Sequence, residues 1–207
     1  MRRKALKIVQ VGDPVLRQRA RAVAPDEIRS RETRKLIDAM QQAMYDAPGV
    51  GLAAPQIGLS LQIAVIEDRE EYLEDVPDED LARRERKAIP FHVIINPVLE
   101  ERPAKPKDLG PDMIQFFEGC LSLGGFTALV PRARHVRVSC LDEHGKRKII
   151  EASGWYARIL QHEIDHLNGR LYIDRMDSRT FASLDNFDHF WKGTPIEEIR
   201  AALSGKS

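Results

Sequence analysis

The amino-acid sequence predicts an α+β fold, in which mixed or antiparallel β-sheets pack around one central helix, with a helix near the N-terminus and a helical tail at the C-terminus. Helical and strand-like segments do not alternate regularly along the chain, which argues against a parallel α/β sheet. Residues 128–152 have the pattern of a β-hairpin, and residues 153–167 have the pattern of a helix whose apolar stripe enters the core.

The composition is that of an ordinary soluble protein with one domain. The 207 residues are 43% hydrophobic and 31% charged, and the 32 Lys and Arg balance the 32 Asp and Glu. This zero net charge argues against a general binder of nucleic acids or membrane surfaces. Two cysteines in a chain of this length do not make a disulfide scaffold, so we expect a reducing compartment.

The sequence has no recognisable export signal. The basic stretch "MRRKALKIVQVGDPVLR" lacks a long apolar core and a small-residue cleavage site, so it does not resemble a secretory signal. No apolar run approaches the roughly 20 residues that cross a bilayer. The sequence is also compatible with the earlier removal of a transit peptide.

The first predicted helix follows Ser30, a good N-cap, and ends at Pro48 and Gly49. Its apolar residues recur at helical spacing: Leu36, Ile37, Met40 and Met44. A glycine-rich turn, "GVGLAAPQIG", comes next, and residues 61–67, "LQIAVIE", are predicted as a buried strand.

Residues 67–90 are dense in charge and are predicted as a solvated surface insertion with helical turns around residues 81–87; a binding role is the alternative. Residues 91–99, "FHVIINPVL", return to strand character, which we expect to end at Asn96-Pro97. Residues 102–111, "RPAKPKDLGP", are predicted as a loop.

The hairpin at residues 128–152 is predicted from valines that alternate with polar residues and from a turn at residues 143–145. Ser153 is the expected N-cap of the central helix, which Asn168 and Gly169 should end.

Near the C-terminus, "TPIEEIRAAL" predicts a further helix. Thr194 and Glu197 have the spacing of a capping box, and Pro195 suits the first helical position. This helix belongs to residues 181–207, which we predict as a C-terminal extension of a single domain formed by residues 1–180.

The central helix contains "HEIDH", with two histidines four residues apart. Each helical residue advances about 100°, so His166 lies about 40° from His162, one turn further on. Two imidazoles in this arrangement can bind one metal ion. Glu163 lies beside both histidines, where it can reach a water molecule without being a ligand. Asp165 lies on the other flank and suits an orienting or surface ion pair.

Two surface histidines are the alternative interpretation, because short strings of this kind arise by chance. The apolar stripe favours the metal site, since it directs the histidines inward, where an unpaired pair would be costly. The extended histidine pattern of many zinc proteases is absent downstream. Cys120 in "FFEGCLSLGG" is the candidate third ligand, because thiolates bind borderline divalent cations strongly. A small buried hydrophobe is the alternative role for Cys120 and the predicted role of Cys140.

Three segments together resemble peptide deformylase: "GVGLAAPQ" at 49–56, "EGCLS" at 118–122 and "QHEIDHL" at 161–167. They stand in the family's order, and the resemblance extends from about Asp13 to Phe181. The charged insertion and "EASGWYARILQHE" are similar to the branch known from mitochondria and plastids, which has relatives in some bacteria. One departure is Thr127, where many bacterial members have an arginine thought to help hold the substrate backbone.

The resemblance implies that residues 1–180 are a catalytic domain that removes the formyl group from the N-terminal formyl-methionine of new polypeptides. It implies a metal held by Cys120, His162 and His166, with one position open for water. Fe²⁺ is the metal that the family is known to use; Zn²⁺, Ni²⁺ or Co²⁺ could replace it, and the ligand types alone would suit Zn²⁺ well.

The resemblance also assigns roles around the metal. Glu163 is expected to act as general base and then general acid. The Gln56 amide and the Leu121 backbone N–H are expected to stabilise the oxyanion. Glu118, next to a ligand, is predicted to orient that ligand or, alternatively, to form a surface salt bridge.

The expected substrate site adjoins these residues. The missing Cβ of Gly51 would let a substrate backbone pair alongside, and Val50 can line a pocket for the methionine side chain. Phe116, Trp155 and Ile159 are predicted as further walls of this pocket, with ordinary core positions as the alternative.

We expect N-formylmethionyl nascent peptides as substrates, transient proximity to the ribosome, and no sequence-specific contact with nucleic acid or with membranes. The chain is expected to be a monomer or homodimer in a bacterial cytoplasm, or in a mitochondrion or plastid if a transit peptide was removed. Two rival hypotheses stay open: a zinc endopeptidase built on the same helix, and a metal-stabilised binding module that docks, for example, at the ribosome.

Overall fold

The structure is a computed structural model that describes residues 6–103 and 110–203. The strands of this part of the chain form two sheets with the orders β1-β2-β3-β6-β7 and β4-β5-β8. The strands span β1 Gly51–Ala53, β2 Ile63–Asp68, β3 Ile89–Arg102, β4 Met113–Cys120, β5 Leu123–Ala133, β6 His135–Leu141, β7 Arg147–Ser153 and β8 Ala182–Ser183. The helices span α1 Pro25–Ile28, α2 Arg31–Asp46, α3 Asp78–Arg84, α4 Gly154–Leu167, α5 Leu184–Phe190 and α6 Ile196–Leu203.

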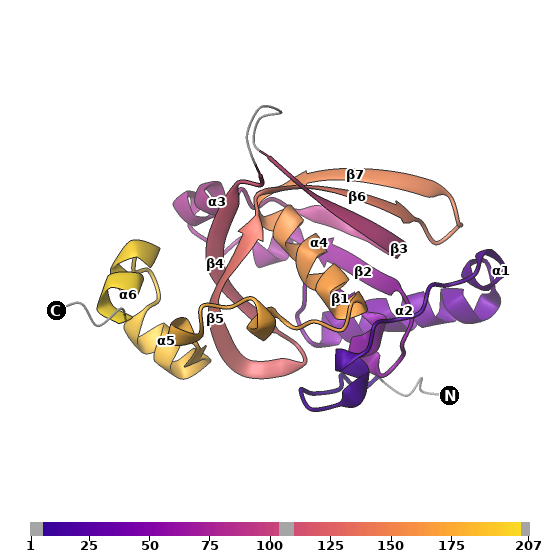
Figure 1. Cartoon of the computed structure of the whole chain (residues 1–207), viewed down its shortest axis with the longest axis horizontal. Coiled ribbons are helices and arrows are strands. Elements are labelled where there is room, and N and C mark those ends of the chain that lie inside the picture. Colours follow the sequence, from indigo (N-terminus) through magenta and orange to yellow (C-terminus); the bar gives the residue numbers. More distant parts are fainter. Residues whose placement is uncertain (1–5, 104–109, 204–207) are drawn as a thin grey trace.

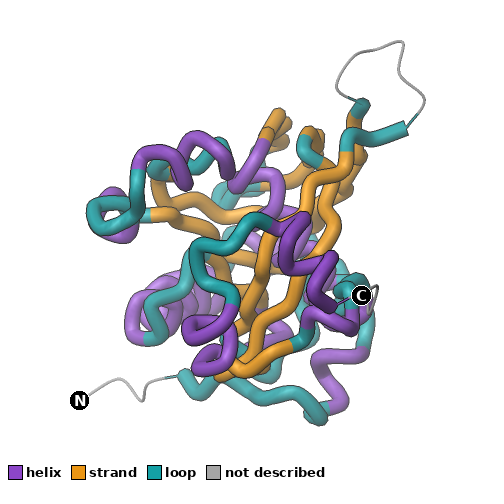
Figure 2. The backbone as a smooth tube through the Cα atoms, turned by 90° about the vertical axis from the view of Figure 1, so that its left-hand side faces the viewer, coloured by secondary structure: helices purple, strands orange, loops and turns teal. Residues whose placement is uncertain are grey.

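Helix α4 is central, and both sheets contact it. It touches β1, β2, β3, β6 and β7 of the larger sheet and β5 of the smaller one, and Figure 1 shows it between the β4-β5 ribbon and the β6-β7 hairpin. All paired strands run antiparallel. The view in Figure 2, turned by 90°, shows the strands in the middle of the molecule with helices around them. The predicted α+β fold with sheets around a central helix is therefore confirmed.

The larger sheet is covered on both faces, because successive side chains of a strand point to opposite sides. In β2, Ile63 and Val65 join the apolar cluster of α2, whereas Ala64 and Ile66 join the cluster of α4. All four side chains are fully buried. This double burial explains why the strand appears in the sequence as a continuous apolar run.

Helix α2 begins and ends close to the predicted positions. The Ser30 hydroxyl oxygen accepts a hydrogen bond from the Thr33 amide at 3.1 Å, as an N-cap should. The predicted apolar positions Ile37, Met40 and Met44 are buried against the sheet. The sequence therefore contained enough local information to place this helix.

Strand β3 continues past the predicted end at Asn96-Pro97. Asn96 has a φ of +50°, and its side chain bonds both the amide and the carbonyl of Val23, at 2.8 and 2.9 Å. The pairing with β6 shifts register between Ile95 and Val98. Asn96-Pro97 therefore forms an irregularity inside a long strand, and the predicted strand end is wrong. Residues 104–109 of the predicted loop lie outside the described residues.

The paired strands β4 and β5 were not predicted as strands around the EGCLS segment. Only Leu121 and Ser122 separate them, and their register shifts between Glu118 and Cys120. Glycines within β5 obscured the strand pattern. This connection places Cys120 at the end of β4, facing α4.

The hairpin β6-β7 has the predicted turn, in which Asp142 Oδ1 accepts from the amides of His144 and Lys146 at 2.9 and 2.8 Å. Ser153 is at the predicted cap position of α4, but its side chain makes no capping hydrogen bond. Gly169, with a φ of +71°, follows the end of α4, as predicted.

The charged insertion is anchored at both ends. Helix α3 lies a few residues before the helical turns that were predicted, and its side chains are largely exposed. Arg86, however, makes two hydrogen bonds of 2.8 Å to Asp68, whose side chain is completely buried. The prediction of a solvated surface insertion is therefore correct for the middle of residues 67–90 but not for their end.

The C-terminal segment packs against the body of the protein. Strand β8 pairs with Phe126 and Thr127 of β5, and α5, which the sequence pattern did not predict, contacts β5. Helix α6 starts at Ile196, one residue after the predicted start at Pro195. In the described residues, no helix is both long enough and apolar enough to cross a membrane.

Candidate active site

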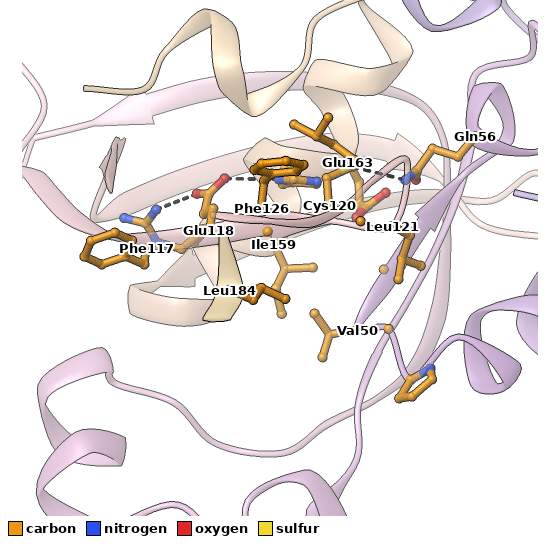
Figure 3. Close-up of a pocket in the computed structure, with 18 of the residues that line it drawn as sticks. Val50, Gln56, Phe117, Glu118, Cys120, Leu121, Phe126, Ile159, Glu163 and Leu184 are labelled. Carbon is orange, nitrogen blue, oxygen red and sulfur yellow. Dashed lines mark hydrogen bonds and ion pairs between the residues drawn. The ribbon is translucent and has the colours of Figure 1, made fainter. Parts of the chain in front are cut away.

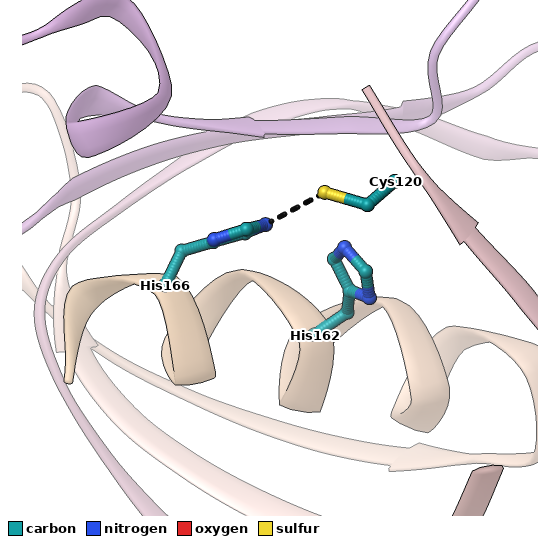
Figure 4. Close-up of side chains that lie close together, drawn as sticks. All are labelled: Cys120, His162 and His166. Atoms are coloured by element: carbon teal, nitrogen blue, oxygen red, sulfur yellow. Dashed lines mark hydrogen bonds between the residues drawn. The ribbon is translucent and has the colours of Figure 1, made fainter. Parts of the chain in front are cut away.

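Helix α4 and the end of β4 bring three potential ligands together. The ring centroids of His162 and His166 lie 5.0 Å apart, and Cys120 Sγ lies 3.2 Å from His166 Nε2. One ligand atom from each of the three residues lies within 4.8 Å of the others, and Figure 4 shows the thiol and both imidazoles converging. This is the arrangement that the HEIDH spacing and the choice of Cys120 predicted.

The donor set fits a metal ion such as iron or zinc. A thiol and two imidazoles are ligands that these ions prefer, and His166 is 1% exposed. His162 Nδ1 lies 3.1 Å from Glu118 Oε2, which leaves Nε2 as the nitrogen for the cluster. A carboxylate on the second ring nitrogen is the usual way in which proteins orient a ligating histidine.

Glu118 is the centre of a buried charge network and not a surface ion pair. Its two carboxylate oxygens accept hydrogen bonds of 3.0 Å from Arg132 Nε and Nη2, and Arg158 Nη1 also donates to Oε1. Burial alone would raise the pKa of Glu118, but the charge of Arg132 and the hydrogen bond with His162 hold it well below its ordinary value. The orienting role expected for Glu118 is supported by this geometry, and a surface salt bridge is excluded because Glu118 is 5% exposed.

Asp165 extends the same network. Its carboxylate accepts a hydrogen bond from Arg132 Nη1, and Arg175 Nε and Nη2 donate to it at 2.8 and 3.0 Å. Asp165 is 5% exposed and Arg132 is 1% exposed, so their ion pair lies inside the protein, whereas the side chain of Arg175 is 30% exposed. Arg132 thus joins β5 to two acids, Glu118 on β4 and Asp165 on α4.

Glu163 points to the opposite flank of α4, toward β1. Burial raises the pKa of its carboxyl to about 7, and Oε2 has no hydrogen-bond partner among the residues that the structure describes. A Cβ built on Gly51 would lie 2.3 Å from Glu163 Oε1. The missing side chain of Gly51 therefore makes room for the Glu163 carboxylate, a reason for glycine that the sequence alone did not indicate.

Gln56 is 1% exposed and lies beside Cys120. Its Oε1 accepts from the Ala53 amide at 2.8 Å, which fixes the orientation of the side-chain amide. Its Nε2 lies 3.6 Å from Cys120 Sγ and 3.4 Å from Ser122 Oγ. Ser122 was not predicted as a site residue, although it belongs to the EGCLS segment.

The site contains a cavity of about 430 Å³, a size typical of small-molecule sites. The cavity is drawn in Figure 3. Of the predicted site residues, the following line it: Val50, Gly51, Gln56, Cys120, Leu121, Trp155, Ile159, His162 and Glu163. His166 is not among the lining residues, although its Nε2 lies 3.2 Å from Cys120 Sγ.

Phe116 does not line the cavity, in contrast to the prediction. Neighbouring residues of a strand point to opposite faces, and it is Phe117 that reaches the cavity. Phe116 packs behind the wall, with its ring centroid 6.5 Å from that of Trp155. The aromatic pair in the sequence gave no indication of which ring faces inward.

The cavity also has lining residues that were not predicted. Arg158 stands one helical turn before His162, so its inward position could have been derived from helical spacing. Phe126 and Leu184 form part of the rim, with exposed fractions of 40% and 45%. Leu184 comes from the C-terminal segment, and its contribution depends on the β5-β8 pairing, for which no local sequence pattern exists.

Comparisons with known proteins agree with this site. A family model described as polypeptide deformylase matches residues 5–182. The chain is 52% identical over 182 residues to peptide deformylase 1A, chloroplastic/mitochondrial, of Arabidopsis thaliana; the match covers 88% of this chain but only 65% of that relative, less than two thirds of its length. It is 43% identical over 198 residues to peptide deformylase 3 of Streptomyces avermitilis, with coverage of 96% and 83%.

A solved structure has the same fold. The Met-Ala-Ser-bound class I type b peptide deformylase from Acinetobacter baumannii is similar with a TM-score of 0.69 at 30% identity, and the match covers 84% of this chain and 99% of that chain. The family match includes all three motifs and all three potential metal ligands. The chain therefore belongs to the polypeptide deformylase family.

Proposed function

We propose that this chain is a metal-dependent hydrolase that removes the formyl group from the N-terminal formyl-methionine of newly synthesised polypeptides and releases formate. The observation that carries the proposal is the convergence of Cys120, His162 and His166 beside Glu163, at one cavity. Family membership supports it. The solved relative binds Met-Ala-Ser, which is the peptide that deformylation of formyl-Met-Ala-Ser would leave.

Cys120, His162 and His166 would hold the metal. When bound, the metal would act as a Lewis acid that lowers the pKa of water and stabilises negative charge. We propose Fe²⁺ as the native ion, on the basis of the family, with Zn²⁺, Ni²⁺ or Co²⁺ as possible replacements. Elemental analysis after anaerobic purification tests this choice, and zinc as the only metal in a fully active sample would overturn it.

Glu163 accepts a proton from the attacking water and delivers it to the departing amine. Its raised pKa, about 7, suits a group that both takes and gives a proton near neutrality. Gln56 Nε2 and the Leu121 amide donate hydrogen bonds to the developing oxyanion. The closeness of Gln56 Nε2 to Cys120 Sγ supports this role.

The methionine side chain enters the apolar part of the cavity, against Val50, Trp155 and Ile159. Ile159 is 4% exposed, which supports a deep and dry position for the side chain. The substrate backbone passes Gly51, which lines the cavity, although the space of its missing Cβ is taken by Glu163. Phe116 supports the wall from behind.

Residues 1–180 form the catalytic domain in this proposal, and residues 181–207 form a C-terminal extension. The family match to residues 5–182 supports the division. The chain acts on N-formylmethionyl nascent peptides near the ribosome, as a monomer or homodimer, without binding specific nucleic-acid sequences or membranes. A bacterial cytoplasm is the proposed location, or a mitochondrion or plastid if a transit peptide was removed.

Release of formate from formyl-Met-Ala-Ser tests the proposed activity, with acetyl-Met-Ala-Ser as the matched control. We expect formate from the first peptide and no hydrolysis of the second. Cleavage of an internal bond in an unblocked peptide would instead favour the zinc endopeptidase. A metal-loaded chain that hydrolyses neither peptide would favour the binding module.

A further inference from the structure

Trp155, a wall of the cavity, is held by two arginines from the charged insertion. Arg84 Cζ lies 5.1 Å from the centroid of the Trp155 ring, and Arg86 Cζ lies 5.3 Å from it. Both distances fall within the range of cation–π contacts, which extends to about 6 Å. The end of the insertion therefore touches the candidate substrate site, although its middle is solvated.

The two arginines differ in what else they contact. Arg86 is fixed by its paired hydrogen bonds to Asp68. Arg84 has no salt bridge with any described residue, and its Nε is buried without a hydrogen-bond partner. Its guanidinium lies against two rings, Trp155 and Phe116, the second at 5.7 Å. A partly buried cation without an acidic partner is costly, and contacts with aromatic faces are the interactions that offset this cost.

Trp155 in turn depends on its neighbours for its orientation. Its indole Nε1 is buried and has no hydrogen-bond partner in the described parts of the chain, so packing and ring contacts alone fix the side chain. The backbone before it is also in contact with the insertion, because a Cβ built on Gly154 would lie 2.4 Å from Glu85 Cβ and 2.8 Å from the Arg84 carbonyl oxygen.

Trp155 and Ile159 are four residues apart on α4, and Glu163 follows after four more. Residues at this spacing share one face of a helix, and all three line the cavity. A change in the orientation of Trp155 would therefore alter the width of the apolar part of the cavity, while the metal ligands and Glu163 would keep their positions.

We propose that Arg84 is a positioning residue that holds Trp155 in place and thereby sets which first side chain the cavity accepts. This inference rests on the proposed deformylase activity, and it gives the charged insertion a part in substrate selection. Arg84 acts through Trp155 and touches neither the metal ligands nor Glu163.

The test compares Arg84→Met and Arg84→Lys with Arg83→Ala in the metal-loaded full chain. Arg83 is a matched control, because it pairs with Asp80 at 2.6 Å on an exposed surface. For Arg84→Met we expect KM for formyl-Met-Ala-Ser to rise about fivefold with kcat and metal content unchanged. The preference for formyl-Met-Ala-Ser over formyl-Phe-Ala-Ser should fall as well. Arg84→Lys should show a smaller change and Arg83→Ala none.

A fluorescence measurement separates this inference from the proposed function. The chain has two tryptophans, so a Trp191→Phe background reports on Trp155 alone. Arg84→Met should shift its emission to longer wavelength and increase quenching by acrylamide. If the wild type releases no formate, the proposed function fails, and with it the role in selection. A different result would be that the wild type releases formate while Arg84→Met has the same KM, substrate preference and tryptophan emission as Arg83→Ala. This result would overturn the role of Arg84 and leave the proposed activity intact.

Discussion

Glu163 illustrates how one residue obtains the properties that the proposed reaction needs. It is 3% exposed, and burial raises the pKa of its carboxyl to about 7. Its Oε2 has no partner among the described residues, so this oxygen is available to a water molecule or a substrate. General bases work best when their pKa lies near the working pH.

Glu163→Gln should lower kcat about 10²- to 10⁴-fold, because the amide cannot take up the proton of the attacking water. The metal content should remain that of the wild type, since Glu163 is not one of the three converging ligands. Formate release and elemental analysis on the same sample measure both effects. Near-normal turnover in this variant would show that another group moves the proton.

Gly51→Ala should impair catalysis by displacing Glu163. The added Cβ would lie 2.3 Å from Oε1 and 2.7 Å from Cδ of Glu163, so the carboxylate must move, and a displacement of about 1 Å can cost about 100-fold in rate. Gly124→Ala is the comparison, because a Cβ there meets no atom within 4 Å. We expect the loss of kcat to be clearly larger at Gly51; equal losses would contradict the steric account.

At the scale of elements, buried charges join α4 to the β4-β5 ribbon. Arg132 on β5 is 1% exposed and pairs with both Glu118 and Asp165. Because Glu118 also contacts His162, the same contacts that attach the helix orient a proposed metal ligand. An apolar contact between these elements could attach the helix, but it could not fix the orientation of the His162 imidazole.

Arg132→Met should reduce the free energy of unfolding by about 3–5 kcal/mol, because it removes a charged hydrogen-bonding partner from each of two buried carboxylates, Glu118 and Asp165. Urea unfolding followed by circular dichroism measures the change. Arg21→Ala, which removes an exposed pair with Glu27, should cause a much smaller change. Similar changes in the two variants would contradict a structural role for the buried network.

The elements that the sequence predicted well are those with local signals. The cap of α2, the turn of β6-β7 and the end of α4 each depend on residues within a few positions of one another. The continuation of β3 through Asn96 was missed because it depends on hydrogen bonds to Val23, 73 residues away. Strand β4 and the first residues of β5 were missed because glycines weaken the strand pattern at the site itself. Residues 128–133 were predicted as part of the hairpin at 128–152, but they belong to β5 and pair with β4.

In the whole molecule, some residues of the candidate site could be predicted from neighbouring positions in the sequence, whereas others reach the site only through contacts between distant segments. Spacing on one helix was sufficient to propose His162 and His166 as a pair, and the chemistry of thiolates together with the family resemblance pointed to Cys120. The rim residue Leu184 and the arginine behind Trp155 reach the cavity only through tertiary packing. No pattern within the chain indicates such contacts.

Removal of the metal should abolish formate release and lower the melting temperature, because an ion that binds only the folded chain stabilises it by about 2.7 kcal/mol at 100 times its Kd. Treatment with a chelator, followed by calorimetry and by reloading with Fe²⁺ or Zn²⁺, measures both effects. A chelated chain with unchanged melting temperature and activity would contradict a metal centre.

The most direct test of the central claim is X-ray absorption at the metal edge of the anaerobically loaded protein. The convergence of Cys120, His162 and His166 predicts one sulfur and two nitrogen atoms from imidazoles among the nearest neighbours of a single ion, with the sulfur lost in Cys120→Ser. A spectrum of the wild type without a sulfur neighbour would contradict the proposed centre.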